Sequence, residues 1–227
     1  MTSDHPLYRT PAGLWRSPLF DSEEWADHAF GTALVRPDGQ WLELKQIHSA
    51  CVVAAEEWRD GLPADGLVTA APRMRLAIKT ADCLPILLAD PRAKVVAAVH
   101  AGWRGSAAGI AIRGVEAMAR LHGSRPEDIR AAFGPSIGVC CFEVGPEVAT
   151  LFSAWFPERN NLDRRTRLDL PAANRRQLIC AGLRPERIAH LAPCTLCGGT
   201  LPGGGEFHSW RREHQTGVRM HSLIWIR

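Results

Sequence analysis

Two apolar runs separated by a short polar turn place the strongest constraint on what this chain can fold into. Residues 84–89 and 94–100 are rich in Leu, Ile, Val and Ala, a composition typical of strands. The segment Asp90-Pro91-Arg92-Ala93 between them favours a type I turn, with Asp first and Pro second. The two runs are therefore predicted to form an antiparallel hairpin in which Cys83 directly faces His100.

The rest of the chain predicts strands that dominate the first hundred residues and then alternate with helices. Further strands are expected at Trp41–Ile47, Cys51–Ala55, Arg75–Lys79, Ile129–Phe133, Arg187–Leu191 and His221–Ile226. Helices are expected from a Ser106 cap to Arg120, closed by Gly123, and at Pro146–Phe156 and Pro171–Ala181. This order indicates an α+β (mixed α/β) fold over residues 1–227, a single domain with a mixed sheet flanked by helices and mostly antiparallel strands in its first half.

Composition excludes several classes of protein. A chain of 227 residues with 46% hydrophobic residues can bury a core without disulfides or structural metals. The net charge of +3 without a basic stripe disfavours nucleic acid as a partner. No apolar run is long enough for a membrane span, and the N-terminus lacks the features of a signal peptide. The 7 cysteines are therefore expected to be reduced thiols in a cytoplasmic protein.

Three residues of metal-ligand type, His48, Cys83 and His100, each lie where a predicted strand ends or in the turn beside one. Two imidazoles and one thiolate with a fourth position open to water are the mark of a catalytic zinc site. A lone His at a strand end is more often hydrogen-bonded or exposed, and a lone Cys is usually a small hydrophobe. From the residues alone, a metal site and these structural roles stay equally open.

A glycine loop, Gly102–Ser106, connects the strand that ends near His100 to a predicted helix. A helix start presents N–H groups to an anion, and Arg104 can add a bidentate grip. A surface salt bridge is the alternative for Arg104. Arg211 is a second candidate for this bidentate contact with an anion. A surface salt bridge is an equally open role for Arg211.

The remaining cysteines form two sequence-local pairs. Cys140 and Cys141 are adjacent, so in an extended chain their side chains would point to opposite sides, and neither is assigned as a metal ligand. Cys194-x-x-Cys197 is compatible with half a zinc ribbon or a redox pair, but a structural thiol pair is favoured because no second pair has ribbon spacing. The glycine-rich segment 198–205 that follows is predicted to be a loop.

Taken together, these segments resemble the laccase-domain family, whose members are also described as multi-specific purine nucleoside phosphorylases, and some as peptidoglycan editing factors. The resemblance extends from about residue 41 to 220 and rests on an ordered set of motifs: Gln46–Ser49, Ala64–Thr69, Thr80–Pro85, His100–Gly105, Gly134–Gly138, Cys140–Gly145, Asp169-Leu170 with Ala173-Asn174, Cys194–Cys197 and Ser209–Arg212. The chain departs from the family pattern at His208 and Trp210, which affects substrate contacts more than metal binding.

The resemblance implies zinc held by His48, Cys83 and His100, with copper reported for members assigned oxidase activity. It also implies phosphorolysis of adenosine, inosine and methylthioadenosine, with phosphate as co-substrate, and hydrolytic deamination of adenosine. Asp82 is the candidate proton carrier, with orientation of a ligand or turn formation as equal alternatives. Arg104 is the second candidate catalytic residue, and substrate contacts are expected from Gln46, Ser49, Lys79 and Arg211.

Three other functions compete with a zinc nucleoside enzyme. A copper-dependent polyphenol oxidase needs many more clustered histidines than the two in this set, and the whole chain has only 9. A hydrolase that edits peptidoglycan precursors would use Cys83 as nucleophile and His100 as base. A metal-stabilised binding domain is disfavoured because structural zinc normally takes four protein ligands. The preferred substrate and the oligomeric state are not predicted.

Overall fold

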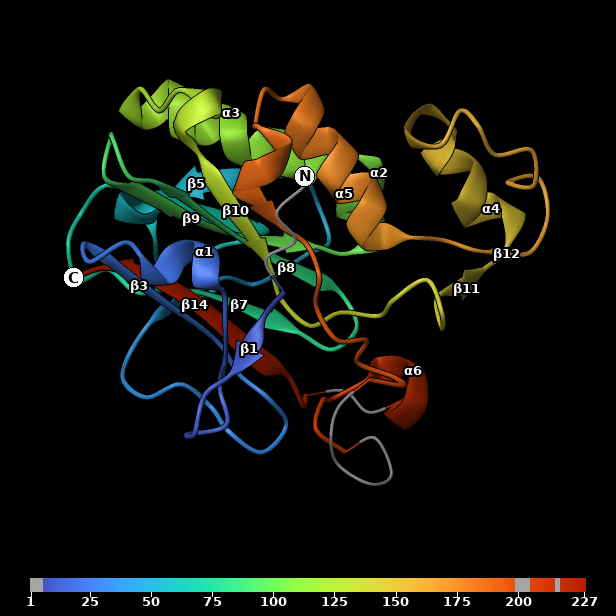
Figure 1. Ribbon diagram of the computed structural model, residues 1–227, viewed down its shortest axis with the longest axis horizontal. Coiled ribbons are helices and arrows are strands. Elements are labelled where there is room, and N and C mark those ends of the chain that lie inside the picture. The colour runs from blue at the N-terminus through green and yellow to red at the C-terminus, as the bar shows by residue number, and fades with distance from the viewer. Residues whose placement is uncertain (1–5, 199–204, 215–216) are drawn as a thin grey trace.

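Two sheets and a layer of helices make up the fold in the computed structural model, which describes residues 6–198, 205–214 and 217–227 (Figure 1). The first sheet has the order β1–β2–β3–β14–β7–β4, comprising Tyr8–Arg9, Trp15–Arg16, Ala26–Phe30, Met220–Ile226, Leu76–Thr80 and Leu42–Glu43. The second has the order β13–β10–β8–β9–β6–β5, comprising Ile188–Ala189, Arg130–Phe133, Leu84–Asp90, Val95–Ala101, Gly66–Thr69 and Val52–Ala54. A small hairpin pairs β11 (Glu143–Val144) with β12 (Thr166–Arg167).

Helices cover the outer face of the second sheet, while its inner face packs against the first sheet. The covering helices are α2 (Trp103–Ala107), α3 (Ile110–His122) and α5 (Leu170–Cys180). Shorter helical segments are α1 (Pro18–Asp21), α4 (Pro146–Ala149), α6 (Trp210–Glu213), η1 (Ala55–Glu57), η2 (Pro126–Asp128), η3 (Thr150–Trp155) and η4 (Pro185–Arg187). The mixed α/β class is confirmed, and no helix among the described residues is long and apolar enough to cross a membrane.

The β8–β9 hairpin lies at the centre of this arrangement, and every residue of both strands is buried. In β8, Leu84, Ile86 and Leu88 join the core under the helices, whereas Leu87 and Ala89 join the core between the sheets. A strand buried on both faces is expected to be apolar throughout, which explains the two continuous runs in the sequence.

The register of this hairpin differs from the prediction. The turn comprises residues 91–94, and Pro85, not Cys83, faces His100. The reason is Asp90, which stays in the ladder while its carboxylate accepts hydrogen bonds from two N–H groups of the turn. A shift of two residues keeps every side chain on its face, so Cys83 still projects to the same side as His100.

The helix after β9 is confirmed, but it begins later than Ser106. Gly109, with φ of 80°, separates α2 from α3, and Gly123, with φ of 69°, ends α3 as predicted. Ser106 does not cap α3. It is buried inside α2, where its hydroxyl accepts a hydrogen bond from Asn174 of α5.

Other differences from the predicted elements are local. The strand expected at 41–47 is reduced to β4, and the helix expected at 146–156 divides into α4 and η3. Strands β3 and β6 were not predicted; β3 contains Asp27 and His28, which interrupt its apolar pattern. Within the predicted glycine loop, residues 199–204 lie outside the described residues.

Candidate metal centre

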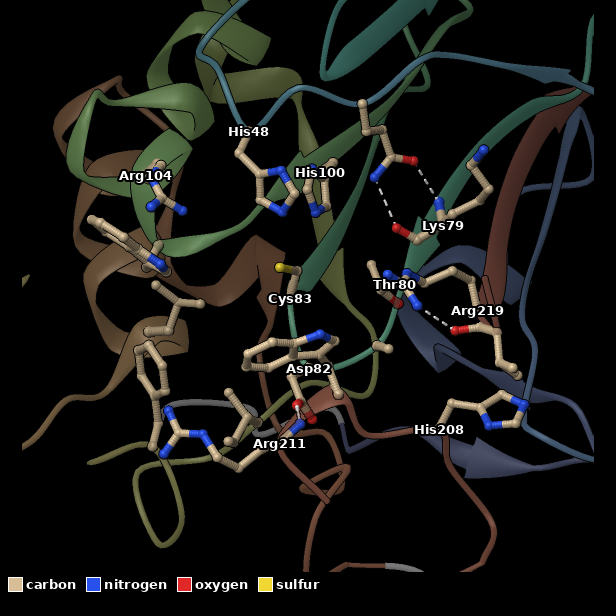
Figure 2. Close-up of a pocket in the computed structure, with 18 of the residues that line it drawn as sticks. His48, Lys79, Thr80, Asp82, Cys83, His100, Arg104, His208, Arg211 and Arg219 are labelled. Atoms are coloured by element: carbon tan, nitrogen blue, oxygen red, sulfur yellow. Dashed lines mark hydrogen bonds between the residues drawn. The ribbon is translucent and has the colours of Figure 1, made fainter. Parts of the chain in front are cut away.

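The three predicted ligands come together at one edge of the molecule's core. The ligand atoms of His48, Cys83 and His100 all lie within 4.8 Å of one another. His100 is near the end of β9, Cys83 directly precedes β8, and His48 is in the loop between β4 and β5. Figure 2 shows the two imidazole rings and the Cys83 sulfur facing a common point at the top of a cavity.

Asp65 fixes the orientation of the buried His100 ring. Its Oδ1 lies 2.8 Å from His100 Nδ1, and the Asp65 side chain is fully buried. Because a carboxylate only accepts hydrogen bonds, Nδ1 must carry the proton, which leaves Nε2 available to a metal. A carboxylate behind a ligand His is the usual arrangement in zinc sites.

The same carboxylate holds the loop that carries His48. Asp65 accepts hydrogen bonds from the successive backbone N–H groups of residues 47, 48 and 49, at 3.3, 3.0 and 2.7 Å, and from the Ser49 hydroxyl at 2.7 Å. His48 has a φ of 60°, a conformation that costs a non-glycine residue about 1 kcal/mol or more. The ring of N–H groups around one anion stabilises that conformation.

Electrostatics favour a thiolate at Cys83. Burial alone would raise the pKa of the thiol, but the charge of His100 and hydrogen bonds from His100 and His48 lower it to about 6. Burial opposes protonation of His100, but the Cys83 thiolate and Asp65 raise the pKa of its imidazole to about 9. The thiolate is the form of cysteine that binds metals.

Gly102 leaves space beside the ligands. A Cβ atom at this position would lie 3.0 Å from Cys83 Sγ and 3.0 Å from His48 Cδ2, closer than side chains normally approach. The φ and ψ of Gly102 are −70° and 166°, a backbone conformation that does not require glycine. Glycine is needed here because a side chain would fill the space beside the ligands. The donor set and this space fit a zinc ion.

A cavity of about 1250 Å³ opens in front of the three ligands. Its walls carry six basic side chains: Arg36, Lys45, Lys79, Arg104, Arg211 and Arg219. Aromatic walls are supplied by Trp103, Phe142 and Trp210, and carboxylates by Asp82, Glu43, Glu143 and Glu147. A cavity this large can hold two small ligands side by side.

The predicted substrate contacts differ in their access to this cavity. Lys79 lines it and pairs with Glu43, with Nζ 3.0 Å from Oε1. Gln46 lines it too, but its amide bonds to both the N–H and the C=O of Lys79, each at 2.8 Å. Ser49 is not part of the lining, because its hydroxyl points to Asp65 behind the ligands.

Arg104 and Arg211 both line the cavity. The exposed Arg104 guanidinium lies 4.1 Å from the centroid of the Trp103 ring, and it makes no ion pair within the described ranges 6–198, 205–214 and 217–227. The Arg211 guanidinium donates to the Glu143 carbonyl at 3.1 and 3.2 Å. Of the two, Arg104 is the more available to an anion.

Asp82 borders the cavity, but both oxygens of its carboxylate accept hydrogen bonds. Oδ1 accepts from the Thr195 hydroxyl at 2.6 Å, and Oδ2 accepts from the Ser209 hydroxyl at 3.1 Å and the Arg211 N–H at 2.7 Å. With a φ of 81°, Asp82 also forms the turn before β8. Its contacts favour the role of an anchor for two C-terminal segments, and proton transfer stays a prediction.

Sequence reasoning did not single out Asp65 and Gly102. The signal for Asp65 was one carboxylate at the start of the otherwise apolar segment 64–68, where a charge must find a buried partner. The sequence predicts only an anion-binding N–H group at Gly102. Its proximity to Cys83 and His48 depends on how segments distant in the sequence fold together.

Comparisons with known proteins agree with the resemblance seen in the motifs. A family model described as multi-copper polyphenol oxidoreductase laccase matches residues 26–227. A purine nucleoside phosphorylase of Deinococcus radiodurans is 43% identical over 192 residues, which are 81% of this chain and 69% of that protein. Adenosine deaminase RL5, from an unknown prokaryotic organism, is 42% identical over 139 residues, 59% of this chain and 53% of that protein.

The fold also has a close match among solved structures. The crystal structure of YlmD from Geobacillus stearothermophilus superposes with a TM-score of 0.82 at 27% identity, covering 98% of this chain and 99% of that one. The chain therefore belongs to the multi-copper polyphenol oxidoreductase laccase family.

Proposed function

We propose that this protein is a zinc-dependent enzyme of purine nucleosides, which catalyses phosphorolysis of adenosine, inosine and methylthioadenosine and hydrolytic deamination of adenosine. The observation that carries the proposal is the set of His48, Cys83 and His100 at the head of a basic and aromatic cavity. The names of the relatives, purine nucleoside phosphorylase and adenosine deaminase, support the substrate class.

Zinc held by the three ligands would act as a Lewis acid that activates water for hydrolysis. The chain's own contribution is to keep the donors in place. Asp65 holds His100 with Nε2 directed at the site and fixes the His48 loop through its backbone. Gly102 keeps the approach to the ligands open.

The nucleoside and phosphate would bind to different walls of the cavity. The purine would stack on Trp210, since flat aromatic faces bind bases regardless of their polar edge and the Trp103 ring already carries Arg104. Phosphate would bind to Arg104, whose guanidinium lies over the Trp103 ring and has no carboxylate partner within the described part of the chain. Arg211 would support Arg104 from the opposite side.

Asp82 stays our candidate for the proton carrier in deamination, with anchoring as the competing role. An Asp82→Asn variant separates the two. If Asp82 carries protons, deamination falls while phosphorolysis remains; if it anchors Arg211 and the turn before β8, both reactions fall together.

The proposal is tested with purified protein, adenosine and phosphate, by separating adenine and inosine on a column. Phosphate-dependent formation of adenine and phosphate-independent formation of inosine are expected. His100→Ala should abolish both reactions. Arg104→Ala should lower kcat/KM for phosphorolysis by about 10–100-fold, the size of a lost charge-assisted contact, and spare deamination.

Arg113→Ala is the matched control, because Arg113 is an exposed arginine of α3 that pairs only with Glu116 among the described residues and lies outside the cavity lining. This variant should keep both activities. Turnover retained in His100→Ala would remove the metal ligands from the reaction and refute the proposal.

One observation favours a second candidate, the hydrolase with a cysteine nucleophile. Without a metal, the lowered pKa of Cys83 and the raised pKa of His100 favour a thiolate–imidazolium pair at neutral pH, the form that an activated cysteine nucleophile takes. Stoichiometric zinc would disfavour this candidate, because zinc would occupy the same sulfur. Metal analysis of the purified protein also distinguishes zinc from the copper of an oxidase.

A further inference from the structure

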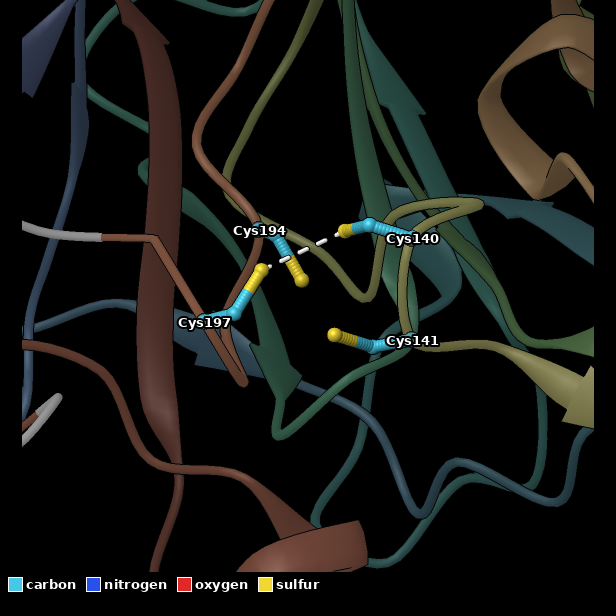
Figure 3. Close-up of side chains that lie close together, drawn as sticks. All are labelled: Cys140, Cys141, Cys194 and Cys197. Carbon is cyan, nitrogen blue, oxygen red and sulfur yellow. Dashed lines mark hydrogen bonds between the residues drawn. The ribbon is translucent and has the colours of Figure 1, made fainter.

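A second group of side chains that could hold a metal ion shares no residue with the three ligands described above. The sulfur atoms of Cys140, Cys141, Cys194 and Cys197 all lie within 4.8 Å of one another. Figure 3 shows the four side chains pointing inward from two segments of chain. We propose that this cluster binds one zinc ion through four thiolates and that the ion ties together two walls of the cavity. The inference does not depend on the proposed function.

The two segments are held side by side by their backbones. Ser136 and Cys194 form an isolated parallel bridge, and the Thr195 N–H donates to the Ser136 carbonyl at 2.9 Å. Cys140 and Cys141 lie in a turn in which the Cys141 N–H donates to the Gly138 carbonyl at 3.0 Å. Because the chain is turned and not extended here, both thiols can face one point, contrary to the expectation from the sequence.

The distances fit a single ion. Zinc with four sulfur ligands at about 2.3 Å in a tetrahedron separates the sulfur atoms by about 3.8 Å. Cys140 Sγ and Cys197 Sγ are 3.3 Å apart, and no pair exceeds 4.8 Å. Closing of the cluster on an ion therefore needs only small side-chain movements. A closed set of four protein ligands is typical of structural zinc.

Backbone N–H groups stabilise a thiolate in this cluster. The Cys194 sulfur accepts a hydrogen bond from the Gly138 N–H at 3.3 Å. Burial would raise the pKa of the Cys194 thiol, but this bond and those from the N–H groups of Cys197 and Leu196 lower it to about 7. Burial and the neighbouring thiols raise the pKa of Cys141 to about 11. A cation would offset this mutual repulsion of charges.

The cluster is connected to the cavity through both segments. Phe142, which follows Cys141, lines the cavity and packs against the Arg211 guanidinium, 5.7 Å from its ring centroid. Thr195, which follows Cys194, donates its hydroxyl to Asp82. An ion that fixes the four cysteines therefore restrains Asp82 and the aromatic wall, without contacting a substrate.

The test begins with zinc content, measured by mass spectrometry on protein purified under reducing conditions. Wild-type protein is expected to contain two zinc ions per chain, one at each site. Cys197→Ser should contain one ion and have a lower melting temperature. Cys180→Ser is the matched control, because Cys180 is exposed and belongs to neither cluster, and this variant should retain both ions.

X-ray absorption at the zinc edge of His100→Ala makes the test independent of whether Cys197→Ser folds. With the first site lost, the remaining zinc should show four sulfur neighbours at about 2.3 Å. A wild-type content of one ion that disappears in His100→Ala would overturn the inference. Nitrogen or oxygen neighbours around the remaining zinc would overturn it as well.

Discussion

Replacing Asp65 with Asn tests the architecture of the candidate metal centre most sharply, because one carboxylate serves two of the three ligands. Oδ1 accepts from His100 Nδ1 and from the His48 N–H, and Oδ2 accepts from the N–H and the hydroxyl of Ser49. An amide has only one oxygen, so its NH₂ group must face donors at one of these positions. Either His100 and the His48 N–H lose their acceptor, or the N–H groups of residues 47 and 49 and the Ser49 hydroxyl lose theirs.

The size of the effect follows from this loss. Removing a partner behind a ligand His typically lowers metal affinity by about 10–100-fold, which corresponds to about 1.4–2.7 kcal/mol. We expect a loss of zinc affinity in this range for Asp65→Asn. Competition with a chromophoric chelator of known affinity measures it directly. The zinc of the four-cysteine cluster is excluded by performing the titration in a Cys197→Ser background.

Asp90→Asn is the matched control for this experiment. Asp90 is also buried and also accepts backbone N–H groups, but it does so in the β8–β9 turn through a single oxygen, which Asn retains. Its zinc affinity should equal that of the wild type. An Asp65→Asn variant that binds zinc as tightly as the wild type would show that the carboxylate does not position the ligands.

Three further predictions concern the same site and the stability of the fold. Gly102→Ala should weaken zinc binding with little loss of melting temperature, because the added Cβ lies 3.0 Å from Cys83 Sγ and from His48 Cδ2 while the backbone conformation suits alanine; unchanged affinity would contradict this. In the Cys197→Ser background, zinc binding at pH 7.5 should release about one proton, since His100, with a pKa of about 9, is protonated and Cys83, with a pKa of about 6, is already a thiolate. Calorimetry in buffers of different ionisation enthalpy measures that release, which should vanish above pH 9. Burial lowers the pKa of His28 to about 3, so between that pH and its unfolded value of 6.5 only the unfolded chain takes up the proton. The free energy of unfolding should therefore fall by up to about 1.4 kcal/mol per pH unit as the pH decreases through this window. His28→Gln, which keeps a hydrogen-bond acceptor, should flatten that slope in denaturant titrations, and an unchanged slope would assign it to other groups.

Features of the fold that depend on local patterns could be predicted from the sequence. The β8–β9 hairpin follows from two apolar runs and a turn, and α3 follows from its apolar face and from Gly123. The register could not be obtained, because the side chain of Asp90 decides how many residues the turn contains. Strand β3 was missed because its polar residues find partners elsewhere in the chain: His28 accepts from the Ser17 N–H.

The proximity of His48, Cys83 and His100 could be expected from residue type, the ends of strands and the family resemblance, whereas the position of Asp65 behind them could not. Asp65 acts through the 47–49 loop and His100, and no sequence spacing relates these segments. The sequence also does not show that the four cysteines form one cluster. Their two pairs are distant in sequence, and only the turn at Cys140 and the bridge between Ser136 and Cys194 bring them together.

The proposed function requires that His48, Cys83 and His100 jointly hold a zinc ion at the head of the cavity. Anomalous diffraction from crystals of the purified protein, recorded on both sides of the zinc absorption edge, tests it most directly. A difference peak is expected within bonding distance of the two imidazole nitrogens and the Cys83 sulfur. Zinc-supplemented crystals with no peak at this position would contradict it.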